Sequence, residues 1–304
     1  FFMKASDLGT YLFYDQEGGY LATDTGPLRR PTQLKSDILL LDDSFVSPAE
    51  WELKVSVPDG SGYQLRHLSS DQYLAEGALV RWPDESLVLT LQPVEGCIPH
   101  PELTLDAEGE VQPRSFEDGS VYGIVDTHSH ILSNFGFGGG GIFHGSAFHR
   151  LGVEHALSDC DEFHGNKGRK DVFGYGYDDG SGGLDAQTLL SILLAGQLSQ
   201  DNHETEGYPT FTEWPNAPGS STHQTQYYLW LQRAWMAGLR LVIQHATTNS
   251  VICEFTVGQN LQSIRYPCND MVGVDRILVE TRNMERYIDA QAGGPGKGFF
   301  RIVE

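Results

Sequence analysis

The sequence predicts a chain of two parts, a small all-β domain followed by an α/β region, and three observations predict it. Residues 3–99 carry short aromatic and aliphatic runs separated by polar turns, as antiparallel strands do. Residues 100–119 are rich in proline and acidic residues, which indicates a linker. Residues 120–304 place apolar strand-like runs between amphipathic helical patterns, which is typical of βαβ units.

The first domain should contain hairpins. Residues 11–14 and 19–22 flank one polar turn, and residues 64–66 and 72–75 flank another. The triplet Tyr-Leu-Ala occurs in the second arm of both, which indicates a weak internal repeat. Further strands are expected at residues 37–41, 51–57 and 86–91.

These Tyr-Leu-Ala hairpins resemble lobes of the β-trefoil found in fascin-like and ricin-like modules. We therefore expect either a trefoil-like domain or a small β-sandwich, and both alternatives stay open. Such modules often bind sugars or peptides, whereas a packing or assembly domain is the simpler interpretation of residues 3–99.

The α/β region should contain three strands and three main helices. The expected strands are residues 121–125, 239–243 and 299–303. The expected helices are residues 184–198, whose apolar density predicts burial, a helix from an N-cap at Thr222 to Gly238, and a helix capped by Asn269 or Asp270 that ends at residues 293–296.

The charge balance disfavours nucleic acids and anionic membranes as partners. The chain has 20 basic and 41 acidic residues, a formal net charge of −21, which repels phosphate groups. No apolar run of about 18 residues is present, so no membrane-spanning helix is predicted. We expect a soluble, acidic protein; a cytoplasmic location is favoured, but the sequence leaves the compartment open.

The four cysteines follow neither a zinc-ribbon nor a redox spacing, so structural thiols are the default expectation. They are Cys97, Cys160, Cys253 and Cys268. The last two are near enough in sequence to form a disulfide if the protein matures in an oxidising compartment. Nothing in the sequence decides between the thiol and disulfide forms.

The chemistry of the α/β region is concentrated after its first strand, where His128 and His130 follow Asp126. In an extended chain, residues two positions apart project from the same face, so both imidazoles can reach one metal ion. Neutral imidazole is the commonest protein ligand for zinc and similar ions. The pair therefore predicts a metal site.

Further candidate site residues lie in two places. The stretch from 134 to 183 is rich in glycine and histidine, and its His144 and His149 flank a glycine run that allows them to approach the first pair. His245 and Asn249 follow the second expected strand, so they should lie at the same sheet edge as His128 and His130. Each of these side chains has a structural alternative, as a hydrogen-bonded core residue or a cap.

The run Gly-Ile-Val-Asp-Thr-His-Ser-His at 123–130 resembles the first barrel strand of the amidohydrolase-type metal-dependent hydrolases. Two later runs narrow the resemblance. Met-Glu-Arg-Tyr-Ile-Asp at 284–289 and Gly-Lys-Gly-Phe-Phe-Arg-Ile-Val at 296–303 resemble a helix and the third strand of bacterial proteins related to membrane dipeptidases, the renal-type zinc peptidases.

The resemblance implies that residues 120–304 are the first part of a TIM-type (β/α) barrel with a long insertion at 133–237. It implies one or two divalent ions, zinc favoured, held by His128 and His130, and a metal-activated water that attacks the carbonyl of a small peptide or amide substrate. Asp126 then acts as a strand-end cap or supports the ligands. The family's general base, bridging glutamate and remaining histidines have no matching position in this sequence.

Because three strands do not close a barrel, two explanations are open. In the first, which we favour, the chain is part of a longer hydrolase, and the missing strands are supplied elsewhere or by a second polypeptide. In the second, the fold is not a barrel. The alternative function is a catalytically inert binding or structural protein in which the β domain recognises a ligand or partner.

Overall fold

A computed structural model describes residues 1–24, 26–35, 44–57, 60–112, 114–178, 185–214 and 221–303. The chain divides into two compact units. The first unit comprises Phe1–Pro101, Arg150–Gly152 and Glu285–Glu304, and the second comprises Glu102–His149 and Val153–Met284. The strand expected at 37–41 lies outside the described residues.

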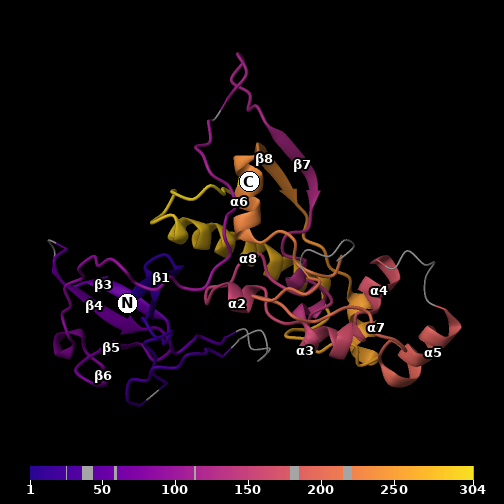
Figure 1. Cartoon of the computed structure of the whole chain (residues 1–304), viewed down its shortest axis with the longest axis horizontal. Helices are drawn as coiled ribbons and strands as arrows, with labels where there is room; N and C mark the ends of the chain where they lie inside the picture. Colours follow the sequence, from indigo (N-terminus) through magenta and orange to yellow (C-terminus); the bar gives the residue numbers. More distant parts are fainter. Residues whose placement is uncertain are drawn as a thin grey trace. The chain divides into compact units, whose positions relative to one another are not determined.

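The first unit is built on one antiparallel sheet of six strands that pair in sequence order, labelled in Figure 1. The strands are β1 (Phe2–Asp7), β2 (Thr10–Tyr14), β3 (Trp51–Val55), β4 (Tyr63–His67), β5 (Gln72–Leu74) and β6 (Leu79–Val80). The expected all-β character of this region is confirmed. Sequential pairing in a single sheet makes the unit a meander, and a trefoil is not shown.

The predicted hairpins have different outcomes. β4 and β5 pair as expected at 64–66 and 72–75. β2 instead pairs mainly with β1, a strand that the sequence analysis missed, and residues 19–22 reach β2 only through the bridge between Tyr14 and Tyr20. The strand expected at 86–91 likewise contributes a single bridge, from Leu89 to Tyr63.

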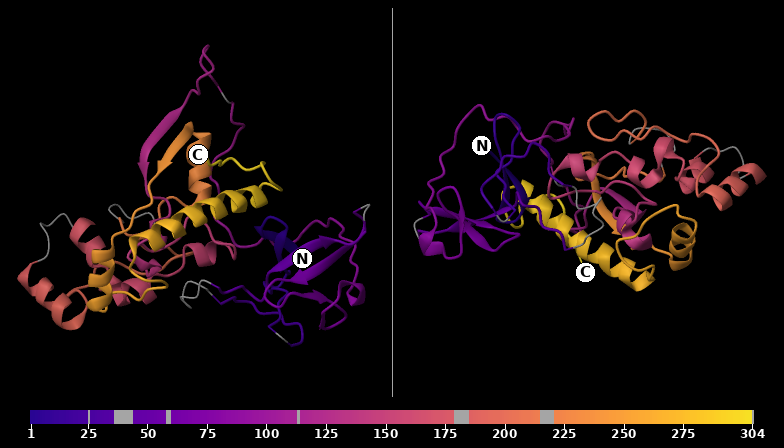
Figure 2. Two further views of the ribbon diagram at one scale, coloured as in Figure 1. Left: turned by 180° about the vertical axis from the view of Figure 1, so that it is seen from behind. Right: turned by 90° about the horizontal axis from the view of Figure 1, so that it is seen from below.

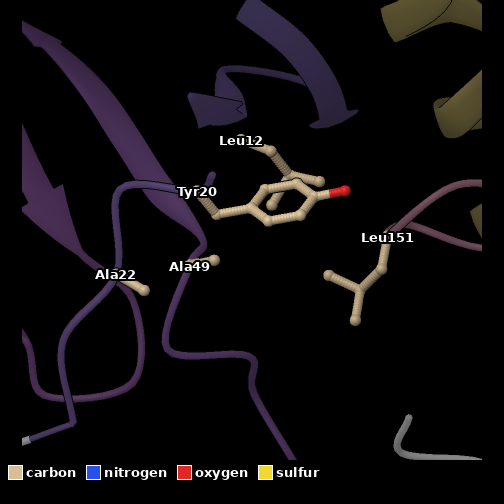
Figure 3. Packing of buried hydrophobic residues seen from close by; sticks show 5 residues of the cluster. All are labelled: Leu12, Tyr20, Ala22, Ala49 and Leu151. Atoms are coloured by element: carbon tan, nitrogen blue, oxygen red, sulfur yellow. The ribbon is translucent and has the colours of Figure 1, made fainter. Parts of the chain in front are cut away.

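Apolar side chains cover both faces of β2. Leu12 is fully buried with Tyr20, Ala22, Ala49 and Leu151 in one cluster, and Figure 3 shows the Leu12 side chain beside the Tyr20 ring. The next residue, Phe13, points to the opposite face, as strand geometry requires, and packs there with a second cluster around the buried Trp51. This two-sided burial makes β2 the centre of the unit.

The last helix, α8 (Asp270–Gln291), is the longest element and is yellow in Figures 1 and 2. Its final turns belong to the first unit, where they are bonded to β1. Gln291 donates from Nε2 to the Ala5 carbonyl over 2.8 Å, and its Oε1 accepts a bond of 2.6 Å from Lys4. Arg286 pairs with Asp7 at 2.8 Å.

The third strand predicted at residues 299–303 does not form, which corrects the sequence analysis. Asp289 is the physical reason. Its carboxylate accepts hydrogen bonds of 2.8 Å from the backbone N–H groups of Gly296 and Gly298, and it pairs with Arg301 at 2.9 Å. These bonds fold the segment back onto the end of α8, away from any strand.

The second unit contains two parallel strands, β7 (Ile124–Ser129) and β8 (Leu239–Gln244), which lie side by side in Figure 1. Its helices include α2 (Val153–Ala156), α3 (Asp161–His164), α4 (Val172–Asp178), α5 (Ala186–Ala195), α6 (Tyr228–Met236) and α7 (Ser250–Gly258). The mixed helix and strand content agrees with the α/β expectation. Among the described residues no third strand joins this pair, so a barrel is not shown.

The first strand of this unit lies later in the chain than predicted. It starts at Ile124 and continues to Ser129 because its parallel pairing with β8 extends to Gln244, while Val121 forms only a bridge to Ser115. His128 is therefore inside the strand rather than after it. An apolar strand of this kind would be expected to be buried, but Ile124 is 60 % exposed.

Helix α5 forms where residues 184–198 predicted a helix, with Gly196 as its left-handed C-cap. Contrary to the expectation from its apolar density, this helix is not buried. The helix packs through Thr188 and Ile192, while its four leucines face outward, up to 78 % exposed for Leu194. Apolar density alone does not determine which face of a helix has a packing partner.

Of the two expected helix caps described next, one does not form and the other does. Thr222 is not an N-cap, because α6 begins only at Tyr228. Asn269 is a cap, and its Oδ1 accepts a bond of 2.9 Å from the Met271 N–H.

Cys253 and Cys268 form a disulfide, whereas Cys97 and Cys160 are free thiols. None of the described helices has the length and hydropathy needed to cross a membrane.

Candidate metal sites

Three histidines meet at the carboxyl ends of β7 and β8. His128 is the next-to-last residue of β7, and His130 immediately follows that strand. His245 immediately follows β8. Because the two strands are parallel, their carboxyl ends share one edge. The backbone N–H of His245 donates to the Ser129 carbonyl over 2.8 Å, which fixes the two strand ends against each other.

The imidazoles of this group, hereafter the exposed histidine group (His128, His130 and His245), lie beside one another, and those of His128 and His130 are in contact. The Nε2 atoms of His128 and His130 are 2.9 Å apart, and the ring centroid of His245 is 4.4 Å from that of His128. Two nitrogens on a tetrahedral zinc ion are about 3.3 Å apart, given zinc–nitrogen distances of about 2.0–2.1 Å. A shift of a few tenths of an ångström would bring the pair to that spacing.

Hydrogen bonds hold the ring of His130 and the backbone of His128. Thr247 Oγ1 is 3.0 Å from His130 Nδ1, and the Asp126 carboxylate accepts a bond of 3.0 Å from the His128 backbone N–H. Asp126 lies inside β7 rather than at its end, and it bonds the backbone of His128 rather than its ring. Burial, then the neighbouring charges of His128 and His245, lower the pKa of His130, which favours the neutral form of the ring.

Two members of the exposed histidine group adjoin a cavity of about 320 Å³. His128 and His130 line it together with His144 and His223. Serine, threonine and glutamine side chains, with Phe143 and Gly145, complete the lining. This volume is at the lower end of small-ligand pockets, of about 300–1,000 Å³. No aspartate or glutamate is among the described lining residues.

The other predicted site residues do not join the exposed histidine group. His144 is buried, with Nε2 bonded to the Ser158 carbonyl at 2.8 Å, and burial lowers its pKa to about 3. His149 stacks on the ring of His155, 5.2 Å away, and does not line the cavity. Asn249 accepts a bond of 3.0 Å from the Ile252 N–H as the N-cap of α7. His144 therefore contributes to the cavity wall, whereas His149 and Asn249 are structural.

A second group, which the sequence analysis did not predict, consists of Cys160, His164, His203 and His223. Each offers one ligand atom, and these atoms all lie within 4.8 Å of one another, so the group can hold a metal ion. We call it the buried Cys-His group, because its accessible area is small. Burial raises the pKa of the Cys160 thiol and lowers that of His164 to about 4.

One local signal of this group was present in the sequence. Cys160 and His164 are four positions apart, the spacing that places two side chains on one face of a helical turn.

Comparisons of this chain with protein-family models, with curated proteins and with solved structures gave no match.

Proposed function

We propose that this chain is a metal-dependent hydrolase of amide or peptide bonds, in which the exposed histidine group holds a divalent ion, with zinc favoured. The observation that carries the proposal is the 2.9 Å separation of the His128 and His130 Nε2 atoms at the carboxyl end of a strand, with His245 beside them. The resemblance of residues 123–130 to the first strand of amidohydrolase-type enzymes points to the same chemistry.

Three histidine ligands with an open side are typical of hydrolytic zinc sites, where the ion supplies Lewis acidity and lowers the pKa of a bound water to about 7. His128 and His245 are solvent-exposed, so a substrate can reach them. The adjoining cavity suits a small peptide or amide, and its polar lining provides hydrogen-bonding groups for a carbonyl. The general base is not assigned among the described residues.

We further propose that β7 and β8 are two neighbouring strands of a larger α/β barrel. Apolar side chains on both strands are exposed, among them Val125 and Ile243. Exposed apolar residues on a parallel pair fit a sheet whose faces and edges are covered by further strands and helices. Those elements would come from further chain or from a second polypeptide.

The alternative function is a catalytically inert binding protein, and one observation favours it. No carboxylate lines the described part of the cavity, whereas hydrolytic metal sites use one as a base or bridging ligand. The two proposals differ in outcome, because the inert protein would bind a metal or ligand without turnover.

The test is metal loading followed by hydrolysis. The protein is stripped with a chelator, reloaded with zinc and assayed on a panel of dipeptides and amides. We expect the double variant H128A/H130A to bind one zinc fewer than the wild type and to lose zinc-dependent turnover. Thr127→Ala is the matched control, because Thr127 immediately precedes His128 and its side chain lies on the opposite face of β7.

Unchanged zinc content in H128A/H130A would refute the metal site. Zinc binding that depends on both histidines, with no turnover of any substrate, would support the inert alternative.

A further inference from the structure

The buried Cys-His group lies in the second unit, apart from the exposed histidine group, and its ligands come from three segments of the chain. Cys160 immediately precedes α3 and His164 is the last residue of that helix. His203 is held by its backbone N–H, which donates to the Lys167 carbonyl over 3.3 Å. His223 lies in a short parallel bridge with His144.

We propose that this group is a closed, structural metal site that takes zinc through Cys160, His164, His203 and His223. The proposal does not rest on the hydrolase activity proposed above. Four cysteine and histidine ligands are the usual complement of a structural zinc site, which leaves no position for a substrate.

The spacing fits such an ion. Cys160 Sγ is 3.4 Å from His203 Nε2, and tetrahedral zinc holds sulfur and nitrogen ligands about 3.6 Å apart. The ring centroid of His223 is 4.8 Å from that of His164 and 4.7 Å from that of His203. The three imidazoles therefore surround one point next to the thiol.

The hydrogen bonds of the group indicate which atoms face the ion. His164 Nε2 is 2.9 Å from the Gly141 carbonyl, which can only accept, so the proton is on Nε2 and Nδ1 carries a lone pair. That Nδ1 is buried without a hydrogen-bond partner among the described residues, and so are both ring nitrogens of His223. Buried nitrogens rarely lack a partner, and one ion would bond to a nitrogen of each ring.

Asp171 supplies the remaining charge. Its Oδ2 accepts a bond of 2.6 Å from the Thr222 hydroxyl, and the same atom is 3.7 Å from His164 Nδ1 and 3.8 Å from His203 Nδ1. A divalent ion, one thiolate and one carboxylate together are neutral, which removes the cost of burying an isolated charge. Among the described residues, His164 and His203 are the only basic groups that pair with this buried carboxylate.

Two glycines allow the backbone to come this close. A Cβ atom on Gly168, whose φ is +66°, would lie 2.5 Å from the His203 ring. A Cβ atom on Gly174 would lie 2.2 Å from the Asp171 carboxylate.

The ion would also hold one wall of the neighbouring cavity in place, because His223 lines that cavity together with His128 and His130.

Cobalt(II) substitution of the stripped full chain tests the proposal. We expect a thiolate-to-cobalt charge-transfer band in the near ultraviolet in the wild type and in H128A/H130A, because the exposed histidine group contains no sulfur ligand. The band should be absent in C160A, which should also bind one zinc fewer. C97S is the matched control, because Cys97 is the other free thiol and lies outside the group.

A second measurement protects the test against misfolded variants. In the native wild-type protein, zinc should slow alkylation of Cys160 relative to the stripped protein, while the rate at Cys97 stays unchanged. A wild type without the band, or a Cys160 alkylation rate that zinc does not change, would overturn the proposal. Retention of the band in the wild type and in H128A/H130A, together with no hydrolysis by the zinc-loaded wild type, would uphold this site and refute only the proposed activity.

Discussion

Thr247 offers the sharpest single-residue test of the exposed histidine group. Its hydroxyl is 3.0 Å from His130 Nδ1, on the side of the ring opposite Nε2. If Nε2 binds the ion, Nδ1 carries the proton and donates a hydrogen bond to the Thr247 hydroxyl oxygen, which fixes the orientation of the ring. Loss of a partner of this kind typically weakens metal affinity 10–100-fold, or by about 1.4–2.7 kcal/mol.

The perturbation is T247A, with T247S as the control that keeps the hydroxyl. Zinc affinity is measured by competition with a chromophoric chelator at pH 7.5, in a C160A background so that the buried Cys-His group does not contribute. We expect T247A to bind zinc about 10–100-fold more weakly and T247S to stay near the parent. Equal affinities of T247A and its parent would show that His130 does not hold the ion through Nε2.

Three further predictions concern stability, each measured by urea denaturation. Removing the Cys253–Cys268 disulfide with C253A/C268A should destabilise the second unit by about 3 kcal/mol, because the bridge closes a loop with a sequence separation of 15, and an unchanged midpoint would contradict this. N249A should cost about 1 kcal/mol through loss of the α7 cap, whereas N249D should cost little. Burial lowers the pKa of His100 from 6.5 to about 4, so between these pH values the unfolded chain binds more protons than the folded chain. Stability should therefore fall as pH falls from about 6.5 to about 4. H100Q should lose this part of the pH dependence of stability.

Local pattern predicted the elements whose stabilising partners are near in sequence. The β4–β5 hairpin follows from two runs around a polar turn, α5 follows from its density of apolar residues, and β8 follows from its apolar run. The end of the chain shows the limit of such patterns. Residues 299–303 look like a strand, but bonds from Asp289 to Gly296 and Gly298 fold them onto α8.

The two histidine groups also differ in how far local sequence patterns could predict them. The spacing of His128 and His130 is visible locally, and His245 could be added because strand ends meet at a shared edge. The buried Cys-His group joins Cys160 to His203 across 43 residues. Only the tertiary fold brings those two segments together, so no local spacing could have revealed the whole set.

The most direct test of the metal-dependent hydrolase proposal is a crystal structure of the zinc-loaded protein, with anomalous scattering measured at the zinc edge. We predict a peak bounded by the Nε2 atoms of His128 and His130, with His245 beside it. The absence of a peak between His128 and His130 at saturating zinc would contradict the proposed active site.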